Sequence, residues 1–152
     1  MTAQGDETAR LVRGFEDGTL ADFPHDAHVR VGWAYARTLP LLDAVARMSD
    51  GLRRFAAGHG VPGKYHETIT WAFMFLIHER VARARIDGHV DDAWDAFARA
   101  NADLFERKLL GRYYSPEALG SAVARRTFVL PDRTGYRDDS DGRDVRGASR
   151  SA

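Results

Sequence analysis

The chain has 152 residues, of which 44% are hydrophobic, and this suits one globular domain with a substantial core. Lys+Arg and Asp+Glu each number 22, so the formal net charge is zero, which argues against a protein whose main task is to bind nucleic acid or an anionic membrane surface. The lack of cysteine excludes disulfides, thiolate metal sites and cysteine nucleophiles.

Helical periodicity runs through most of the chain, and no stretch of any length alternates as a strand does. Prolines and a serine mark several of the expected helix boundaries. The pattern predicts, in chain order, a short leading helix over ETARLVRGF, a helix at about 25–37, a helix from Pro40 to about 57, a helix at about 65–85, a helix at about 91–106, and a short last helix that Ser115 caps and Pro116 opens.

Short turns between the four main helices predict an all-α, single-domain, up-down bundle over residues 1–131. Residues 132–152 have almost nothing to bury, so we expect a disordered polar tail. The N-terminus lacks the apolar core of a signal peptide, and the longest apolar run is far shorter than the roughly 20 residues of a spanning helix. We therefore expect a cytoplasmic protein with no membrane partner. The abundance of arginine and alanine is typical of a GC-rich bacterial genome.

Histidines stand at the beginning of two predicted helices. His25 and His28 open the first main helix and are three residues apart, so they share one face. His66 and Glu67 open the third main helix, directly before the apolar run 69–77. In an up-down bundle the first and third helices run the same way, so their starts lie at the same end. The sequence therefore predicts that His25, His28 and His66 meet.

Three imidazoles at one end of a bundle form a ligand set for one divalent transition metal: iron, copper or zinc. A single first-turn histidine is more often a surface or capping residue, so the prediction depends on the convergence of all three. The positive helix ends disfavour protonation and leave the rings free to ligate. Thr70 stands where the zincin motif H-E-x-x-H needs its second histidine. Glu67 is left open as a fourth ligand, a general base or a cap.

Further residues are candidates for supporting roles around this cluster. Tyr65 joins Glu67 as a candidate catalytic residue. Asn101 falls on an otherwise apolar helix face, where it would either orient a ligand histidine or make a buried structural hydrogen bond. The other candidates are Thr70 on the face of His66, Trp71 as a pocket wall or core residue, Arg53 as a substrate-carboxylate ligand or solvated residue, and His59, whose membership of the site stays open.

The spacing of these stretches resembles an uncharacterised family of small bacterial proteins. The resemblance consists of Phe15-Glu16 with Gly18-Thr19-Leu20, His25 with His28, Gly51-Leu52-Arg53-Arg54-Phe55, and Tyr65-His66-Glu67-Thr68-Ile69-Thr70, within residues 10–80. The sequence departs from the family pattern at Lys64 and at Phe23-Pro24, neither of which is a proposed ligand. The resemblance implies that His25, His28, His66 and Glu67 act as one set, and it implies no reaction type.

Three functions follow from these residues. The first is a metal-dependent enzyme acting on a small organic molecule through a mononuclear His site, with oxidation slightly favoured over zinc-type hydrolysis or elimination. The second is a metal-free binding protein or lyase that uses His66 and Glu67 as an acid–base pair. The third is a structural or interaction domain. We expect a small-molecule substrate and no nucleic acid, and a homodimer stays open.

Overall fold

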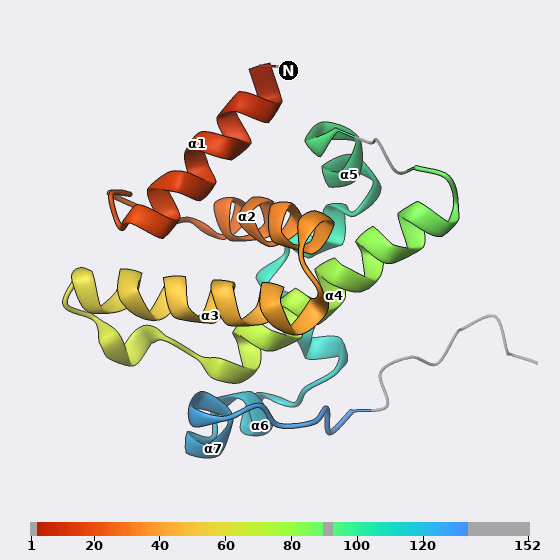
Figure 1. Ribbon diagram of the computed structural model, residues 1–152. Helices are drawn as coiled ribbons and strands as arrows, with labels where there is room; N and C mark the ends of the chain where they lie inside the picture. The colour runs from red at the N-terminus through yellow and green to blue at the C-terminus, as the bar shows by residue number, and fades with distance from the viewer. Residues whose placement is uncertain (1–2, 90–92, 134–152) are drawn as a thin grey trace, which may run out of the picture.

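All regular elements of the computed structural model, which describes residues 3–89 and 93–133, are helical (Figure 1). The prediction of an all-α fold is confirmed. Among these residues, no helix is both long and apolar enough to cross a bilayer. The α-helices are α1 (Ala3–Asp17), α2 (His25–Thr38), α3 (Leu41–Gly58), α4 (Glu67–Ile86), α5 (Trp94–Ala100), α6 (Pro116–Gly120) and α7 (Ala122–Arg126), and 3₁₀ helices cover Pro62–Lys64, Ala102–Phe105 and Arg107–Arg112.

The centre of the molecule consists of α2, α3 and α4, which begin and end close to the predicted positions. In Figure 1, α2 and α4 run in the same general direction, and α3, which connects them in the sequence, runs in the opposite direction. A glycine allows α2 and α4 to pack closely: a Cβ atom at Gly32 would lie 2.9 Å from Ile77 and 3.0 Å from Met74. The parallel course of α2 and α4 brings their N-terminal ends to the same side of the core.

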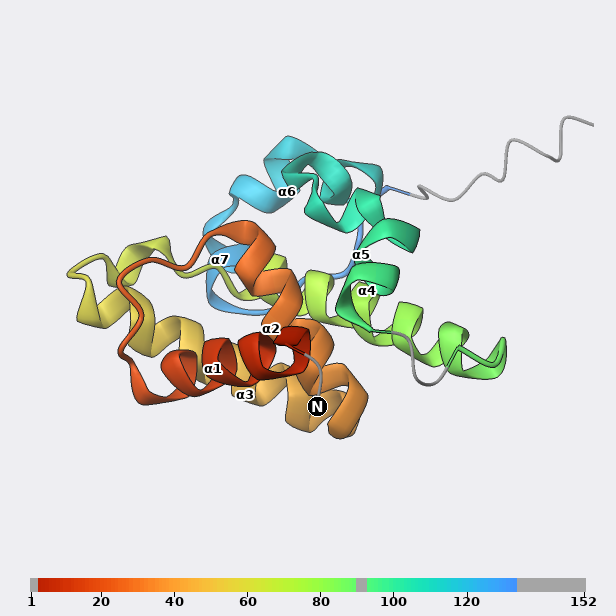
Figure 2. The same cartoon turned by 90° about the horizontal axis from the view of Figure 1, so that it is seen from above.

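The leading helix α1 is longer than predicted, at 15 residues, and lies across α2 and α3 (Figure 2). Its buried Phe15 stacks on Phe23 with ring centroids 4.6 Å apart and packs directly against the backbone of Gly51. Arg30 of α2 holds the first half of α1 by donating to the hydroxyl of Thr8 at 2.8 Å and to the carbonyl of Gln4 at 3.1 Å. Long-range packing therefore stabilises turns at the start of α1 that the apolar pattern alone did not indicate.

The prediction of one helix over 91–106 is wrong in its extent, because the α-helix ends at Ala100 and a 3₁₀ helix follows (residues 91–92 lie outside the described part). Asn101 causes this break through its side chain. Its amide nitrogen donates to the carbonyl of Phe97 at 2.9 Å, and its amide oxygen accepts from Arg80 at 2.9 Å. An amide side chain that satisfies the last turn in this way competes with continuation of the helix.

The last predicted helix is two short helices, α6 and α7. Ser115 caps α6 as predicted, since its hydroxyl accepts from the backbone N–H of Ala118 at 3.1 Å. Ser121 ends α6 and caps α7 by accepting from the N–H of Ala124 at 3.2 Å. Each serine hydroxyl satisfies an N–H that a helix start leaves free.

The chain after α7 returns to α4 and is fastened there by Thr68, which is fully buried. The Thr68 hydroxyl donates to the carbonyl of Thr127 at 2.8 Å and accepts from the N–H of Val129 at 3.1 Å. Asp132, the first residue of the predicted tail, accepts from the N–H of Ser115 at 2.7 Å. The rest of that predicted tail, from residue 134 onward, lies outside the described residues.

Candidate functional site

A pocket of about 560 Å³ opens between α2, α3 and α4 at the end where α2 and α4 begin. This volume is within the range of small-molecule binding sites in proteins. Most of the inner wall is apolar, so the pocket suits a ligand with a hydrophobic body. The apolar wall consists of Met48, Leu52, Phe55, Phe73, Met74 and Ile77.

Two imidazoles from the first turn of α2 line this pocket together. The ring centroids of His25 and His28 are 6.2 Å apart. The Nε2 atom of His25 is 2.9 Å from the carbonyl oxygen of Leu104, and its ring meets Phe73 edge-on at 4.9 Å. The ring of His28 lies 4.2 Å from that of Phe23. Helical spacing placed the two histidines on one face, and the aromatic neighbours hold their rings against the cavity.

His66 lines the same pocket, but both of its ring nitrogens are engaged with the backbone. As the N-cap of α4, its Nδ1 accepts from the N–H of Ile69 at 3.1 Å. Its Nε2 is 2.7 Å from the carbonyl oxygen of Leu119, which accepts the Nε2 proton of the neutral ring. A metal would therefore have to displace one of these hydrogen bonds.

The three histidines do not form a ready ligand set. Within the described residues, no three histidine or acidic side chains gather closely enough to hold an ion. The metal centre of His25, His28 and His66 stays a prediction.

His28 is held in its neutral form. Its pKa is lowered from 6.5 to about 4, mainly by burial and to a smaller extent by the nearby His25 and Arg107. A hydrogen bond with the backbone of Phe23 and the charge of Asp26 oppose this shift without cancelling it. At neutral pH the ring can therefore accept a proton or bind through a free nitrogen.

Two positively charged side chains belong to the lining of the pocket. Lys64 and Arg107 line it, and no carboxylate belongs to its lining in the described part of the chain. The N-cap of α2 is Pro24, whose side chain cannot accept a hydrogen bond from the first turn. The partial positive charge of that helix end therefore adds to the two cations. This electrostatic arrangement favours a ligand with an anionic group.

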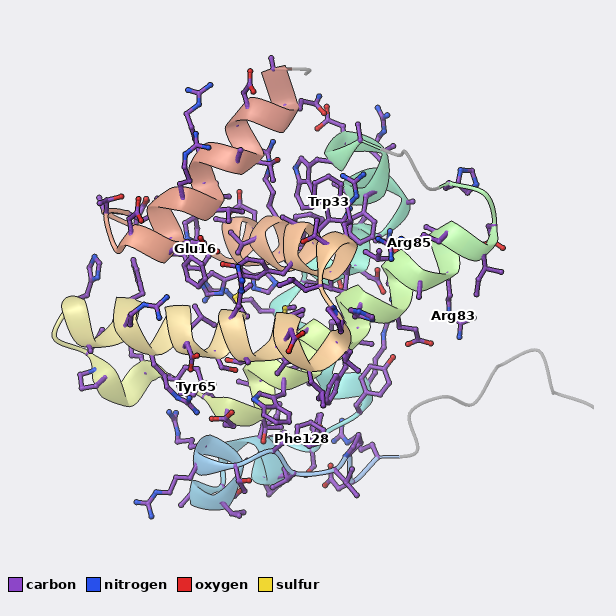
Figure 3. The ribbon with its side chains drawn as sticks, viewed as in Figure 1. Glu16, Trp33, Tyr65, Arg83, Arg85 and Phe128 are labelled. Carbon is purple, nitrogen blue, oxygen red and sulfur yellow. The ribbon has the colours of Figure 1, made fainter. Side chains whose placement is uncertain are left out.

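Glu67, the other half of the predicted acid–base pair, is buried beside the pocket and not part of its lining. It forms an ion pair with Arg53, whose guanidinium lies over the ring of Tyr65 at 4.8 Å. Glu67 thus holds Arg53, and Arg53 holds the Tyr65 ring in the pocket wall (Figure 3 labels Tyr65). Arg53 does not belong to the lining of the pocket, and its link to a substrate carboxylate stays a prediction.

Tyr65 presents an unusual polar group on the inner side of the pocket wall. Its hydroxyl and that of Ser49 are buried, and neither forms a hydrogen bond of good geometry within the described residues, although the hydroxyls of Ser49 and Thr70 lie close enough to act on that of Tyr65. Burial raises the pKa of Tyr65 above its ordinary value. A buried hydroxyl that lacks a well-formed hydrogen bond is costly to the folded state.

The remaining predicted residues divide between the pocket and other parts of the fold. Thr70 lines the pocket and donates to the carbonyl of His66 at 2.8 Å. Trp71 stacks on Phe128 at 5.8 Å, outside the lining. Asn101 has the structural role in the break after α5 described above. His59 is exposed and also outside the lining, with its nitrogens 2.9 and 3.0 Å from the carbonyl oxygens of Phe55 and Ala21.

Sequence reasoning missed Lys64 and Arg107 as members of this site. Arg107 follows Glu106 in a stretch read as the end of a helix, and nothing local distinguishes it from a surface arginine.

In comparisons with known proteins, no family model matches the chain, and no curated protein or solved structure matches it significantly. The resemblance of residues 10–80 to a bacterial family stays a prediction.

Proposed function

We propose that the protein binds a small organic anion in this pocket and transfers a proton to or from it through His28. The observation that supports this most directly is an imidazole facing an apolar cavity whose lining carries two cations and, in the described residues, no carboxylate. The apolar body of the ligand lies over Phe73 and its neighbours, and the anionic group lies near Arg107 and Lys64. This is the metal-free alternative of the sequence, with His28 in place of His66 and Glu67.

A neutral imidazole is the form that a general base requires. An anion bound beside Arg107 would stabilise the protonated form of His28, so ligand binding itself would raise the low pKa of this ring. The ring of Tyr65 lines the same pocket, and its buried hydroxyl lies close to Ser49 and Thr70.

Thermal unfolding with a panel of hydrophobic acids tests the binding step. Benzoate, phenylacetate and hexanoate at 10 mM are compared with their neutral amides. A ligand with a Kd of about 1 mM stabilises the folded state by about 1.4 kcal/mol at this concentration, a rise in Tm of roughly 3–6 °C. We expect stabilisation by the acids and not by the amides, and a weaker effect in Arg107→Gln.

Lys108→Gln is the matched control, because Lys108 is the exposed neighbour of Arg107 and is not part of the lining. NMR titration of the His28 ring in the presence of a stabilising acid gives a second readout, in which the pKa should rise. Equal stabilisation of the Arg107 and Lys108 variants, or an unmoved His28 pKa, would refute this proposal.

A metal-dependent reaction is the second candidate, and the position of His25 relative to His28 favours it. Two imidazoles that share one ion through metal–nitrogen bonds of about 2.1 Å have ring centroids roughly 5–6.5 Å apart. The observed 6.2 Å lies in this range. A bis-histidine site of this kind would hold iron, copper or zinc, and His66 would join it only after losing its hydrogen bond with Ile69 or with Leu119.

Metal analysis of untagged protein tests this second candidate. Stoichiometric metal that is lost in His25→Ala and His28→Ala, and retained in His78→Ala, would support it. His78 is a partly buried histidine farther along α4 that does not line the pocket. If iron, copper and zinc neither bind stoichiometrically nor raise the Tm, the metal-dependent reaction is wrong.

A further inference from the structure

A second, larger cavity of about 870 Å³ lies between α1, α2 and the region where α4 ends and α5 begins. None of its lining residues is shared with the pocket described above. Aromatic residues line part of it: Trp33 and Trp94 lie with ring centroids 5.4 Å apart, and Tyr35, which is also buried, belongs to the lining. We call this cavity the arginine groove.

Four guanidiniums from four helices line the arginine groove: Arg13 of α1, Arg37 of α2, Arg47 of α3 and Arg85 of α4. The carboxylate that lines it in the described residues is Glu16.

Glu16 is already engaged. It accepts from the hydroxyl of Tyr35 at 2.9 Å and pairs with Arg47 at 3.5 Å. Arg13, Arg37 and Arg85 therefore face the groove without a carboxylate partner in the described part of the chain. This local excess of positive charge contrasts with the zero formal charge of the whole protein.

Two of these arginines are oriented by neighbours that leave their charge unneutralised. The guanidinium of Arg37 lies over the ring of Trp33 at 4.5 Å. Arg85 donates a hydrogen bond to the backbone carbonyl of Arg37, which brings the two side chains to the same part of the groove. Figure 3 labels Glu16, Trp33 and Arg85, which reach the groove from α1, α2 and α4.

Guanidinium groups offer planar, paired N–H donors that match the oxygens of phosphate and carboxylate. Several such groups around one cavity favour an anion with more than one charge, and indole rings favour a flat apolar body that can stack. We propose that the arginine groove binds a small organic phosphate that carries a planar aromatic ring. The phosphate lies among Arg13, Arg37 and Arg85, and the ring lies against Trp33 and Trp94.

Isothermal titration calorimetry with adenosine monophosphate tests this assignment at low ionic strength. We expect binding at one site with a submillimolar Kd that weakens as salt is added. Adenosine and inorganic phosphate should each bind at least about 10-fold more weakly, because each offers only half of the contacts. Tryptophan fluorescence should change on binding, since two of the three tryptophans line the groove.

Arg37→Gln and Arg85→Gln should each weaken the binding of adenosine monophosphate at least about 5-fold. Arg10→Gln is the matched control, because Arg10 is an exposed arginine of α1 that does not line the groove. Arg107→Gln, which alters the other pocket, should leave this Kd unchanged and so separates the two sites. Equal weakening in the Arg10 and Arg85 variants, or no binding up to 10 mM, would overturn the proposal.

Discussion

Replacement of His28 by glutamine should remove a specific part of the dependence of stability on pH. The folded protein holds the pKa of His28 at about 4, whereas the unfolded chain has the ordinary value of 6.5. Between these values the unfolded chain binds a proton that the folded chain does not, so stability falls as the pH is lowered through this window and rises as the pH is raised. His25, Arg107 and Asp26 are the charged or titratable groups that act on this ring.

The magnitude follows from the two pKa values. Between pH 8 and pH 5, protonation of the unfolded chain at this one residue destabilises the folded state by about 2 kcal/mol, approaching about 3 kcal/mol below pH 4. Urea unfolding of the wild type and of His28→Gln at pH 8 and pH 5 measures this contribution, because the other titrating groups act in both proteins. The wild type should lose about 2 kcal/mol more than the variant.

Direct titration of the His28 ring by NMR is an independent check. If the wild type and the variant lose the same free energy of unfolding to within about 0.5 kcal/mol, or if the ring titrates above pH 6, then burial does not hold His28 neutral. His28 would then not be the base of this pocket.

Three further substitutions test the packing around the sites by urea unfolding. Gly51→Ala should destabilise the folded protein by about 1–3 kcal/mol, because the new Cβ would lie 2.2 Å from the ring of Phe15. Gly58→Ala is the control, because nothing lies within 4 Å of a Cβ atom there, and it should not destabilise the protein. Equal effects of the two substitutions would contradict this reason. Thr68→Val should lose about 1–3 kcal/mol and speed proteolysis after α7, since both hydrogen bonds of the buried hydroxyl disappear; an unchanged stability would show that they contribute nothing. Tyr65→Phe should raise stability by about 1 kcal/mol, because it removes a buried hydroxyl that lacks a well-formed hydrogen bond; a loss would mean that this hydroxyl is satisfied in solution.

Local sequence signals were enough to predict where helices begin and which residues share a helix face. Pro24, Pro40 and Ser115 mark helix beginnings because each acts on its own backbone within one turn. His25 and His28 share a face for the same local reason, the 3.6-residue period. The up-down arrangement of the first three main helices then placed His66 beside the same cavity.

The end of the helix at Asn101 could not be predicted from such local signals. The Asn101 amide ends a helix that the apolar period would have continued, and the arginine that holds it comes from α4. His66 is a second case, because the atom that occupies its Nε2 is a carbonyl 53 residues away in α6. Neither contact leaves a trace in the spacing of nearby residues.

The sequence by itself determined that the chain is helical and which end of α2 carries imidazoles, since these depend on backbone geometry repeated every few residues. Tertiary structure alone decided which ring nitrogens remain free, that Arg107 and Lys64 border the cavity, and that Glu67 faces Arg53. The physical reason is that burial and charge pairing depend on atoms brought together by folding, and the order of residues does not fix those neighbours.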